Sequence, residues 1–126
     1  MAKSSFEYVK QYEIEEKLLL NTFIVLRIDG RGFHEFSDAF CLEKPNDKRL
    51  IKLFNKCSRE ILKKFDEIVL AYGQSDEYSF AFRRTANLFN RRRDKILSCV
   101  VSYFSTSFVI FWPKYFPNSQ LKLIPS

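Results

Sequence analysis

Residues 68–82 read IVLAYGQSDEYSFAF, and this stretch decides the fold that the sequence predicts. It holds two runs rich in β-branched and aromatic residues, 68–72 and 78–82, each typical of a strand. The segment between them, GQSDE, is short enough for a β-hairpin. Further out, residues 22–28 (TFIVLRI) form another strand-like run, which stops at an Asp-Gly turn signal. The sequence thus predicts three strands, two of them joined in a hairpin.

Two long helical patterns lie among these strands. Pro45-Asn46-Asp47 offers a helix start, with Asn46 or Asp47 as the cap, and this helix is expected to run to about Phe65. A longer pattern covers residues 86–111 and is expected to stop at Trp112-Pro113. In the first helix an apolar stripe opposes basic residues that face water: Leu50, Phe54, Cys57, Ile61 and Phe65 against Lys52, Lys56, Arg59 and Lys63.

The remaining segments complete the expected order of elements. Periodic apolar residues predict a helix over residues 6–20, residues 33–43 read as irregular, and residues 120–124 as the beginning of a strand. Without the leading helix the order is βαββαβ, the α+β ferredoxin-like plan, with its last strand incomplete. No linker or repeat interrupts the chain, so residues 1–126 are expected to form a single domain. In that plan the end of the first strand and the hairpin turn lie side by side at one sheet edge.

Composition limits the class of protein. The chain is 46% hydrophobic and 29% charged, which is typical of a globular protein and not of a disordered one. No apolar run is expected to be long enough for a membrane span, and the four Glu of residues 1–17 argue against a secretory signal. Cys41, Cys57 and Cys99 read as reduced thiols. The protein is expected inside the cell, in the cytoplasm or the nucleus, and away from membranes.

The net charge of +6 is unevenly distributed. Residues 1–79 hold 13 basic and 14 acidic side chains, whereas residues 80–126 hold 8 basic and 1 acidic. This asymmetry is equally compatible with a polyanionic partner for the second part and with a solvated basic helix face.

The residues suited to chemistry concentrate in two loops. Asp29 ends the first strand, and the segment DGRGFH that it opens contains two of the three glycines and the only histidine. Asp76 and Glu77 lie in the hairpin connection. Mg²⁺ takes one or two carboxylates and completes its shell with phosphate oxygens and water, and two such ions about 3.5–4 Å apart serve nucleotidyl transfer. Each loop taken alone is also typical of ordinary turn chemistry. The two together favour a nucleotide and metal site.

Four segments strongly resemble the tRNA-His guanylyltransferase family. They are residues 27–34 (RIDGRGFH), 44–49 (KPNDKR), 71–80 (AYGQSDEYSF) and 90–95 (NRRRDK), and the resemblance extends over the chain from Phe6 onward. It implies a polymerase-type palm that adds a guanylate to the 5′ end of tRNA-His, at position −1. In that reaction ATP first activates the 5′-monophosphate, and the 3′-hydroxyl of GTP then attacks and expels AMP. The implied partners are tRNA-His, GTP and ATP, the implied cofactor is two Mg²⁺ ions, and the family works as an oligomer, commonly a tetramer.

The resemblance also implies roles for individual residues. Metal ligands would be Asp29, Asp76 and the Gly30 carbonyl, and the catalytic set would add Glu77, His34 and Lys44. Nucleotide binding is expected from Gly30, Arg31, Gly32, Phe33, His34, Ser75 and Asp76, together with Arg27 and Lys95. Arg91, Arg92 and Arg93 are expected to bind tRNA.

The chain departs from the family pattern in length. The family is about twice as long, so the resemblance is to its N-terminal half. Three alternatives remain open: a relative that repairs truncated 5′ ends of tRNA, a non-catalytic module that binds tRNA or nucleotide, and a nucleotidyl cyclase on the same palm. The cyclase explains the acids but not the matches at residues 44–49 and 73–80.

Overall fold

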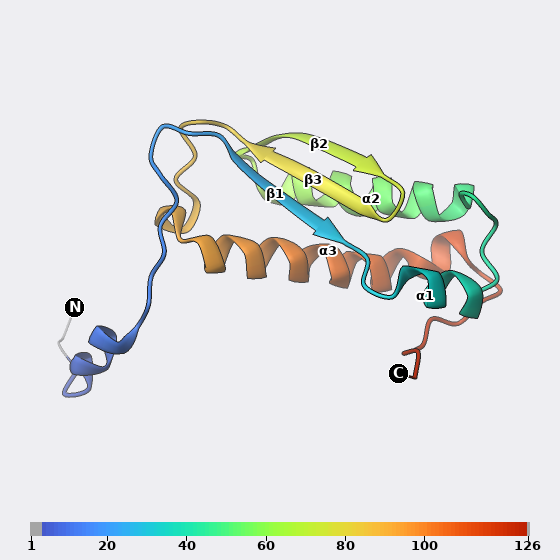
Figure 1. Ribbon diagram of the computed structural model, residues 1–126, viewed down its shortest axis with the longest axis horizontal. Coiled ribbons are helices and arrows are strands. Elements are labelled where there is room, and N and C mark those ends of the chain that lie inside the picture. Colours follow the sequence, from blue (N-terminus) through green and yellow to red (C-terminus); the bar gives the residue numbers. More distant parts are fainter. Residues whose placement is uncertain (1–3, 126) are drawn as a thin grey trace.

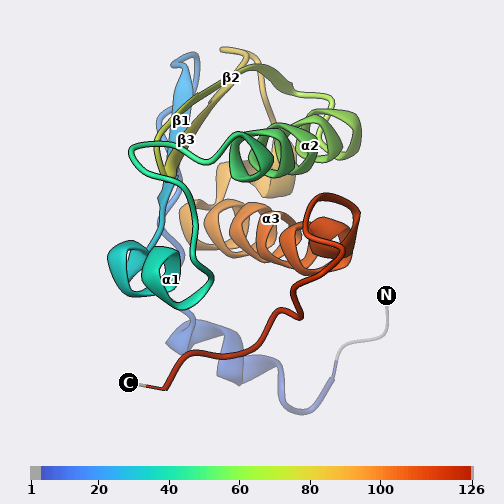
Figure 2. The ribbon, with the colours of Figure 1, turned by 90° about the vertical axis from the view of Figure 1, so that its right-hand side faces the viewer.

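A computed structural model describes residues 4–125 (Figure 1). A three-stranded antiparallel sheet is covered on one face by two long helices, which pack on each other (Figure 2). The elements in chain order are the 3₁₀ helix η1 (Glu7–Tyr12), β1 (Ile24–Asp29), α1 (Phe33–Ala39), α2 (Lys48–Lys64), β2 (Ile68–Gln74), β3 (Glu77–Phe82), the 3₁₀ helix η2 (Leu88–Arg91) and α3 (Arg93–Tyr115). The strand order in the sheet is β1-β3-β2.

The predicted hairpin is confirmed as β2 and β3. Gln74 pairs with Glu77, so only Ser75 and Asp76 form the turn. Ser75 has a φ of 57°, the left-handed conformation that tight two-residue turns require. Gly73 is needed for space, because a Cβ at this position would collide with the ring of Tyr78. The turn is therefore held in one register with Asp76 at its tip.

The first strand closes the sheet on the other side of β3. Its register runs from Ile24 opposite Phe82 to Asp29 opposite Glu77. Ile24 and Leu26 are buried under the helices, whereas Val25 and Arg27 point to the open face, as the two-residue period of a strand dictates. The expected strand over residues 22–28 is confirmed with a shift of one to two residues.

The core is rich in aromatic rings. Trp112 on α3 is fully buried, stacks on Phe116 with ring centroids 3.9 Å apart, and donates its indole N–H to the Ser119 carbonyl at 2.8 Å. Phe80 and Phe82 of β3 are also fully buried. Each such side chain contributes roughly 1.5–3 kcal/mol by leaving water. The sheet and both long helices are thereby held together.

The expected N-terminal helix over residues 6–20 is wrong. Only η1 forms there, all of its residues are exposed, and it lies apart from the sheet and the long helices (Figure 1). Ile14 is 88% exposed, and Leu18 packs against the core from an extended segment and not from a helix. A short helix with no buried face is marginal in water, so the apolar spacing did not suffice.

The segment expected to be irregular, residues 33–43, contains helix α1 instead. Phe36 of α1 and Phe40, the residue that caps its C-terminal end, pack on Trp112 with ring centroids 5.9 and 5.2 Å away. Their spacing of four residues places both rings on one helix face, and tertiary packing on α3 then stabilises seven residues that would not form a helix alone.

The second long helix begins later and ends later than expected. Phe89, Asn90 and Arg91 have left-handed φ values, so α3 begins only at Arg93. It continues through Pro113 to Tyr115: the proline removes only its own N–H, the donor to the carbonyl four residues earlier, and the Phe116 N–H still donates to the Trp112 carbonyl at 2.9 Å. Within residues 4–125, the segment 120–124 forms no strand.

Helix α3 also corrects the expectation about apolar runs. By length and composition it could cross a membrane, a test that the central helix of a folded core passes as well. Here Ile96, Val100 and Phe104 of α3 are buried in the core of the fold.

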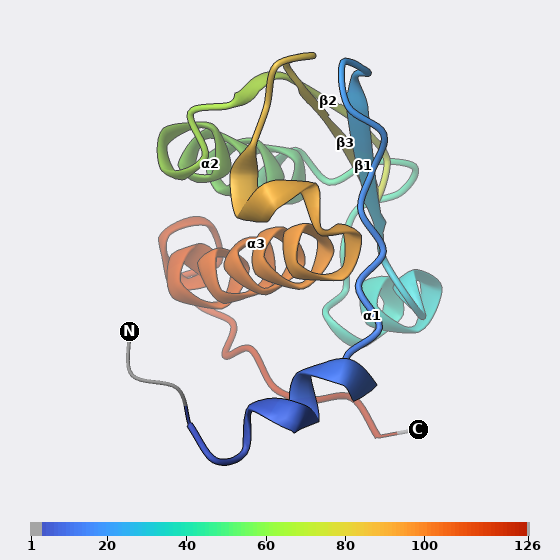
Figure 3. The same ribbon diagram turned by 90° about the vertical axis from the view of Figure 1, so that its left-hand side faces the viewer.

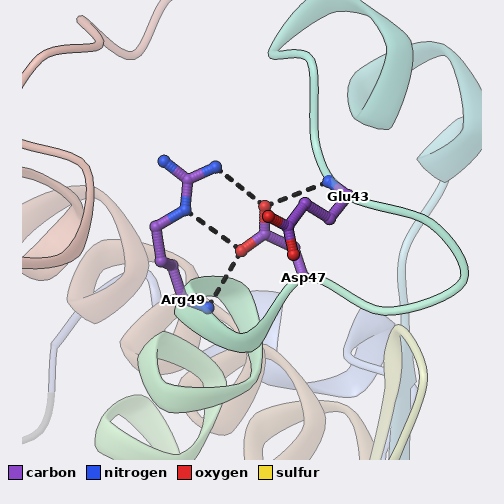
Figure 4. Close-up of polar contacts among 3 residues, drawn as sticks. All are labelled: Glu43, Asp47 and Arg49. Atoms are coloured by element: carbon purple, nitrogen blue, oxygen red, sulfur yellow. Dashed lines mark hydrogen bonds and ion pairs between the residues drawn. The ribbon is translucent and has the colours of Figure 1, made fainter.

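The start of α2 is held by a buried carboxylate (Figure 4). Asp47 caps the helix and accepts four hydrogen bonds, from the Glu43 N–H (3.1 Å), the Arg49 N–H (2.9 Å), and Nε and Nη2 of Arg49 (3.1 and 2.8 Å). Its side chain is only 2% exposed. The hydrogen bonds from Arg49 lower the pKa of Asp47 from 3.8 to about 2.

This pKa difference predicts an acid-dependent stability. The folded-state pKa lies below the unfolded value, so the contribution of Asp47 is complete above about pH 4 and is lost as the pH falls toward 2. Asp47→Asn should lower the free energy of unfolding by roughly 2 kcal/mol at pH 7, and the deficit should shrink with acidification. Urea titrations between pH 7 and pH 3 measure this difference. The exposed Asp66→Asn is the control, and a deficit independent of pH would contradict the assignment.

Candidate active site

The end of β1 and the hairpin turn meet at one edge of the sheet, as predicted. Asp29 and Glu77 are register partners, and the Gly30 N–H donates to the backbone carbonyl of Asp76 at 3.1 Å. This hydrogen bond continues the ladder beyond the last strand residue. It fixes the backbone that follows Asp29 against the turn that carries Asp76.

Gly30 leaves room for the carboxylate of Asp76. A Cβ at position 30 would lie 3.0 Å from Oδ2 of Asp76 and 3.3 Å from the ring of Phe33. A side chain at this position would therefore push the carboxylate away. Gly32 has a φ of 65°, which favours glycine, and it lets the chain turn sharply into α1.

A cavity of about 360 Å³ opens beside these residues. Asp29, Gly30, Arg31 and Asp76 form its polar part. The rest of its lining is mostly apolar and comes from the sheet, α1, α2 and α3: Ile28, Phe33, Phe36, Phe54, Tyr78, Val101, Phe104, Ser105, Phe108 and Val109. A space lined by a few charged residues and by many aromatic rings suits a ligand with a flat ring and a charged tail.

Two carboxylates and a backbone carbonyl are the oxygen donors available to a metal here. Among residues 4–125, no three His, Cys, Asp or Glu side chains gather into a ready-made metal cage. Mg²⁺ does not need one, since it commonly takes one or two carboxylates and completes its shell with substrate phosphates and water. The Asp29 and Asp76 carboxylates with the Gly30 carbonyl fit that pattern.

The predicted acid Glu77 lies on the open face of the sheet. By strand alternation it shares this face with Arg27 and with its register partner Asp29, which also borders the cavity at the end of the strand. Arg27 and Glu77 form an ion pair of 3.9 Å. Glu77 and Arg27 do not line the aromatic cavity. They flank the site on the sheet surface.

His34 and Lys44 come together away from the cavity. Lys44 Nζ donates to Asp38 on α1 at 2.8 Å, and this hydrogen bond, with a smaller contribution from the charge of His34, lowers the pKa of Asp38. The loop that carries Lys44 still adjoins the site, because Pro45 and Asn46 share a small recess with Ser75 of the hairpin turn. The residues that follow Lys44 are thus neighbours of the hairpin turn that carries Asp76.

The predicted basic residues at the end of η2 and the start of α3 lie away from the cavity. Arg91 is only 2% exposed, so its side chain is not presented to tRNA, which corrects the expectation for this residue. Its guanidinium donates to carbonyls of Leu18, Leu19, Thr22, Arg84 and Ala86 at 2.7–3.4 Å. Figure 3 shows the segment before β1 passing η2 and the start of α3, where these bonds form.

Arg92, Arg93 and Lys95 stay at the surface beside that crossing. Arg92 pairs with Glu15 at 3.5 Å, and Arg93 pairs with Glu16 and Asp94. Lys95 lies over the ring of Phe89 and lines a separate recess with Glu13, Glu15 and Glu16. Acidic side chains therefore accompany this basic run, and its role toward tRNA or nucleotide stays a prediction.

The aromatic lining was not recognised from the sequence. Phe54, Phe104 and Phe108 read as apolar positions of the two long helices, and Phe36 lay in the segment that read as irregular; the four rings come from three helices. Tyr78 follows the predicted acids directly and was the available signal. Its hydroxyl donates to Asn55 Oδ1 at 2.5 Å, and burial raises its pKa. Tyr78 lines the cavity, and its ring stacks on that of Phe80 with centroids 5.7 Å apart.

Three comparisons with known proteins all find members of one family. The profile of the family described as "Thg1: tRNAHis guanylyltransferase" matches residues 6–126. The tRNA(His) guanylyltransferase of Eremothecium gossypii is 50% identical over 122 residues, which is 96% of this chain and 52% of that relative. The crystal structure of the Saccharomyces cerevisiae tRNA(His) guanylyltransferase is 42% identical, with a TM-score of 0.89 over 94% of this chain and 52% of that one.

A bacterial tRNA(His) guanylyltransferase (Thg1)-like protein is more distant. It is 26% identical with a TM-score of 0.81, and its structures are complexes with GTP and with ATP. Both matches cover 94% of the present chain. They cover 59% of the bacterial chain in the GTP complex and 54% of it in the ATP complex. It thus spans about half the length of the relatives that it matches.

Proposed function

Because the chain belongs to the tRNAHis guanylyltransferase family, a family of nucleotidyltransferases, we propose that it carries the catalytic palm of an enzyme that adds a guanylate to the 5′ end of tRNA-His. The observation that carries the proposal is the meeting of Asp29 and Asp76 at Gly30. The Gly30 N–H donates to the Asp76 carbonyl at 3.1 Å, and both aspartates are among the residues that line the aromatic cavity. The bacterial relative's complexes with GTP and ATP support a nucleotide at this site.

In this proposal the chain's own groups bind and orient the nucleotide. Asp29, Asp76 and the Gly30 carbonyl would hold two Mg²⁺ ions, which neutralise phosphate charge and polarise the reacting oxygens. Arg31 at the polar side of the cavity would pair with a phosphate, and the rings of Phe33 and Tyr78 would contact the base.

The proposed chemistry has two transfers. A 5′-phosphate oxygen of the tRNA attacks the α-phosphorus of ATP, and pyrophosphate leaves. The 3′-hydroxyl of GTP then attacks the activated 5′-phosphorus, loses its proton, and AMP leaves. Glu77 on the sheet surface, and His34 and Lys44 outside the cavity around Asp38, would support these steps through charge.

The proposed palm rests on the order of the strands. β1-β3-β2, with helices crossing one face, is what the first three strands of a βαββαβ sheet would show. We propose that residues 1–126 form one catalytic unit of this kind, in a protein that works as an oligomer inside the cell.

A binding module without turnover is the second candidate. The observation in its favour is that the structures of the bacterial relative are complexes with GTP and with ATP, which support nucleotide binding but do not by themselves require turnover. Such a module would bind Mg²⁺-GTP or tRNA but would leave the 5′ end of the tRNA unchanged.

The test is an addition assay with labelled GTP, ATP, Mg²⁺ and 5′-monophosphorylated tRNA-His. We expect a product one nucleotide longer, with label at position −1. A tRNA-His that already carries a 5′-triphosphate should react without ATP, because its 5′ end is already activated. A 5′-truncated tRNA of another identity distinguishes general end repair. Binding of GTP without any extension, in every preparation, would contradict the enzyme and favour the module.

A further inference from the structure

Helix α2 is the most basic element of the described structure. Over 17 residues it contains one acidic residue, Glu60. Its seven basic residues are Lys48, Arg49, Lys52, Lys56, Arg59, Lys63 and Lys64. The positive charge of this helix does not show in the net charge of residues 1–79, because acidic residues elsewhere in that part of the chain balance it.

Four of these side chains form a stripe, defined as Lys48, Lys52, Arg59 and Lys63. Their spacing of 4, 11 and 15 residues from Lys48 places them within one side of an α-helix, and all four are exposed. The opposite side carries the buried Leu53, Cys57 and Ile61. The stripe extends over about 22 Å, at 1.5 Å of rise per residue.

The stripe is not neutralised from within the fold. Among residues 4–125, Lys48, Lys52 and Arg59 form no ion pair, and Lys63 contacts only Glu60 at 3.6 Å. Glu60 is bound more closely by Lys56, at 2.8 Å. Like charges four residues apart, as in Lys48 and Lys52 or Arg59 and Lys63, destabilise a helix. This arrangement of like charges does not stabilise the fold. It therefore favours a role in binding an anion outside the chain.

The stripe begins next to the candidate active site. Leu50 and Ile51, in the first turn of α2, line the recess that also contains Ser75, the neighbour of Asp76. From there α2 runs along the sheet to its other end (Figure 1). In the end-on view α3 and the sheet cover two sides of α2, and its outer side is uncovered (Figure 2).

We propose that this stripe binds the phosphate backbone of an RNA helix whose 5′ end lies at Asp29 and Asp76. The inference rests on the proposed function, because the reacting 5′ phosphate sets where the RNA begins. Phosphate contacts from Lys and Arg position a nucleic acid without reading its sequence. The stripe thus holds the stem behind the reacting end, and the aromatic cavity holds the nucleotide that is added.

The test compares two variants of equal charge. Lys52→Gln/Arg59→Gln removes two cations from the stripe, and the control Lys114→Gln/Lys122→Gln removes two exposed cations from the C-terminal part of the chain. Binding of a 5′-monophosphorylated RNA stem is measured by fluorescence anisotropy over a series of salt concentrations. Each lost phosphate contact reduces the magnitude of the slope of log K against log salt by about 0.7–0.9. The slope of the stripe variant should therefore be smaller in magnitude by roughly 1.5, and that of the control almost unchanged.

The outcomes separate this proposal from the proposed function. Far-UV circular dichroism checks that α2 is intact, and Mg²⁺-GTP affinity should be unchanged in both variants because neither touches the cavity. A stripe variant with weaker RNA binding and a reduced slope supports the proposal even if the protein adds no nucleotide. An equal loss of RNA binding in both variants, or an unchanged slope in the stripe variant, overturns the proposal. It is also overturned if the parent protein binds anionic vesicles through the stripe more strongly than the RNA stem.

Discussion

Asp76→Ala should abolish nucleotide addition by the protein, and Asp29→Ala should do the same. In the proposed site each carboxylate is one of only two that can hold Mg²⁺ against the triphosphate. Its removal is expected to cost several kcal/mol of transition-state stabilisation, or about three orders of magnitude in rate. Single-turnover extension of tRNA-His with labelled GTP, with and without added Mg²⁺, measures this loss.

The controls for this prediction follow from the geometry of the turn. The hydrogen bond from Gly30 ends on the backbone carbonyl of Asp76, so it survives any change of the side chain. Both variants should therefore unfold in urea within about 0.5 kcal/mol of the parent, as surface substitutions generally do. The exposed Asp66→Asn should extend tRNA normally. Near-normal turnover by either alanine variant would refute the assignment of these acids.

Arg91→Ala should destabilise the fold more than any neighbouring arginine substitution. Its guanidinium fills the space between residues 18–22 and the turn before η2, with donors 2.7 Å from the Leu19 and Ala86 carbonyls. Hydrogen bonds to a charged group contribute more than neutral ones, and their removal leaves several carbonyls without a partner. We expect a loss of about 3–5 kcal/mol, a large part of the total stability of a small domain.

Two comparisons make the Arg91 prediction specific. Arg92→Ala and Arg93→Ala remove partly exposed ion pairs, and exposed pairs contribute only about 0–1 kcal/mol. Arg91→Lys retains the charge but not the planar fork, so it should recover only part of the loss. Chemical denaturation of all four proteins gives the ranking. An Arg91→Ala protein as stable as Arg92→Ala would show that the buried bonds contribute little.

The parts of the fold that were predictable depend on short-range chemistry. The hairpin follows from a two-residue turn flanked by β-rich runs, and the start of α2 follows from Asp47 as a cap. The meeting of Asp29 with the hairpin turn could be predicted as well, because antiparallel pairing of β1 with β3 brings those ends together. These features need only neighbours in sequence and one assumption about strand order.

The parts that were not predictable depend on distant partners. Arg91 lies in a run of three arginines that is typical of a solvated surface, and its burial depends on carbonyls about 70 residues earlier in the chain. Helix α1 forms because Trp112 covers it, and the expected N-terminal helix fails because nothing covers it. The aromatic cavity combines four separate elements, so no local pattern distinguishes its rings from the ordinary core.

The separation of the two acids along the chain has a consequence for folding. The hairpin with Asp76 closes a turn of two residues, whereas β1 with Asp29 must find β3 across about 50 residues of intervening chain. Closing the longer loop costs more entropy, so β1 is expected to join the sheet after the hairpin has formed. Until then Asp29 and Asp76 are on separate parts of the chain. A ligand that needs both carboxylates therefore binds only the finished sheet, and by mass action it stabilises that state over every partly folded one.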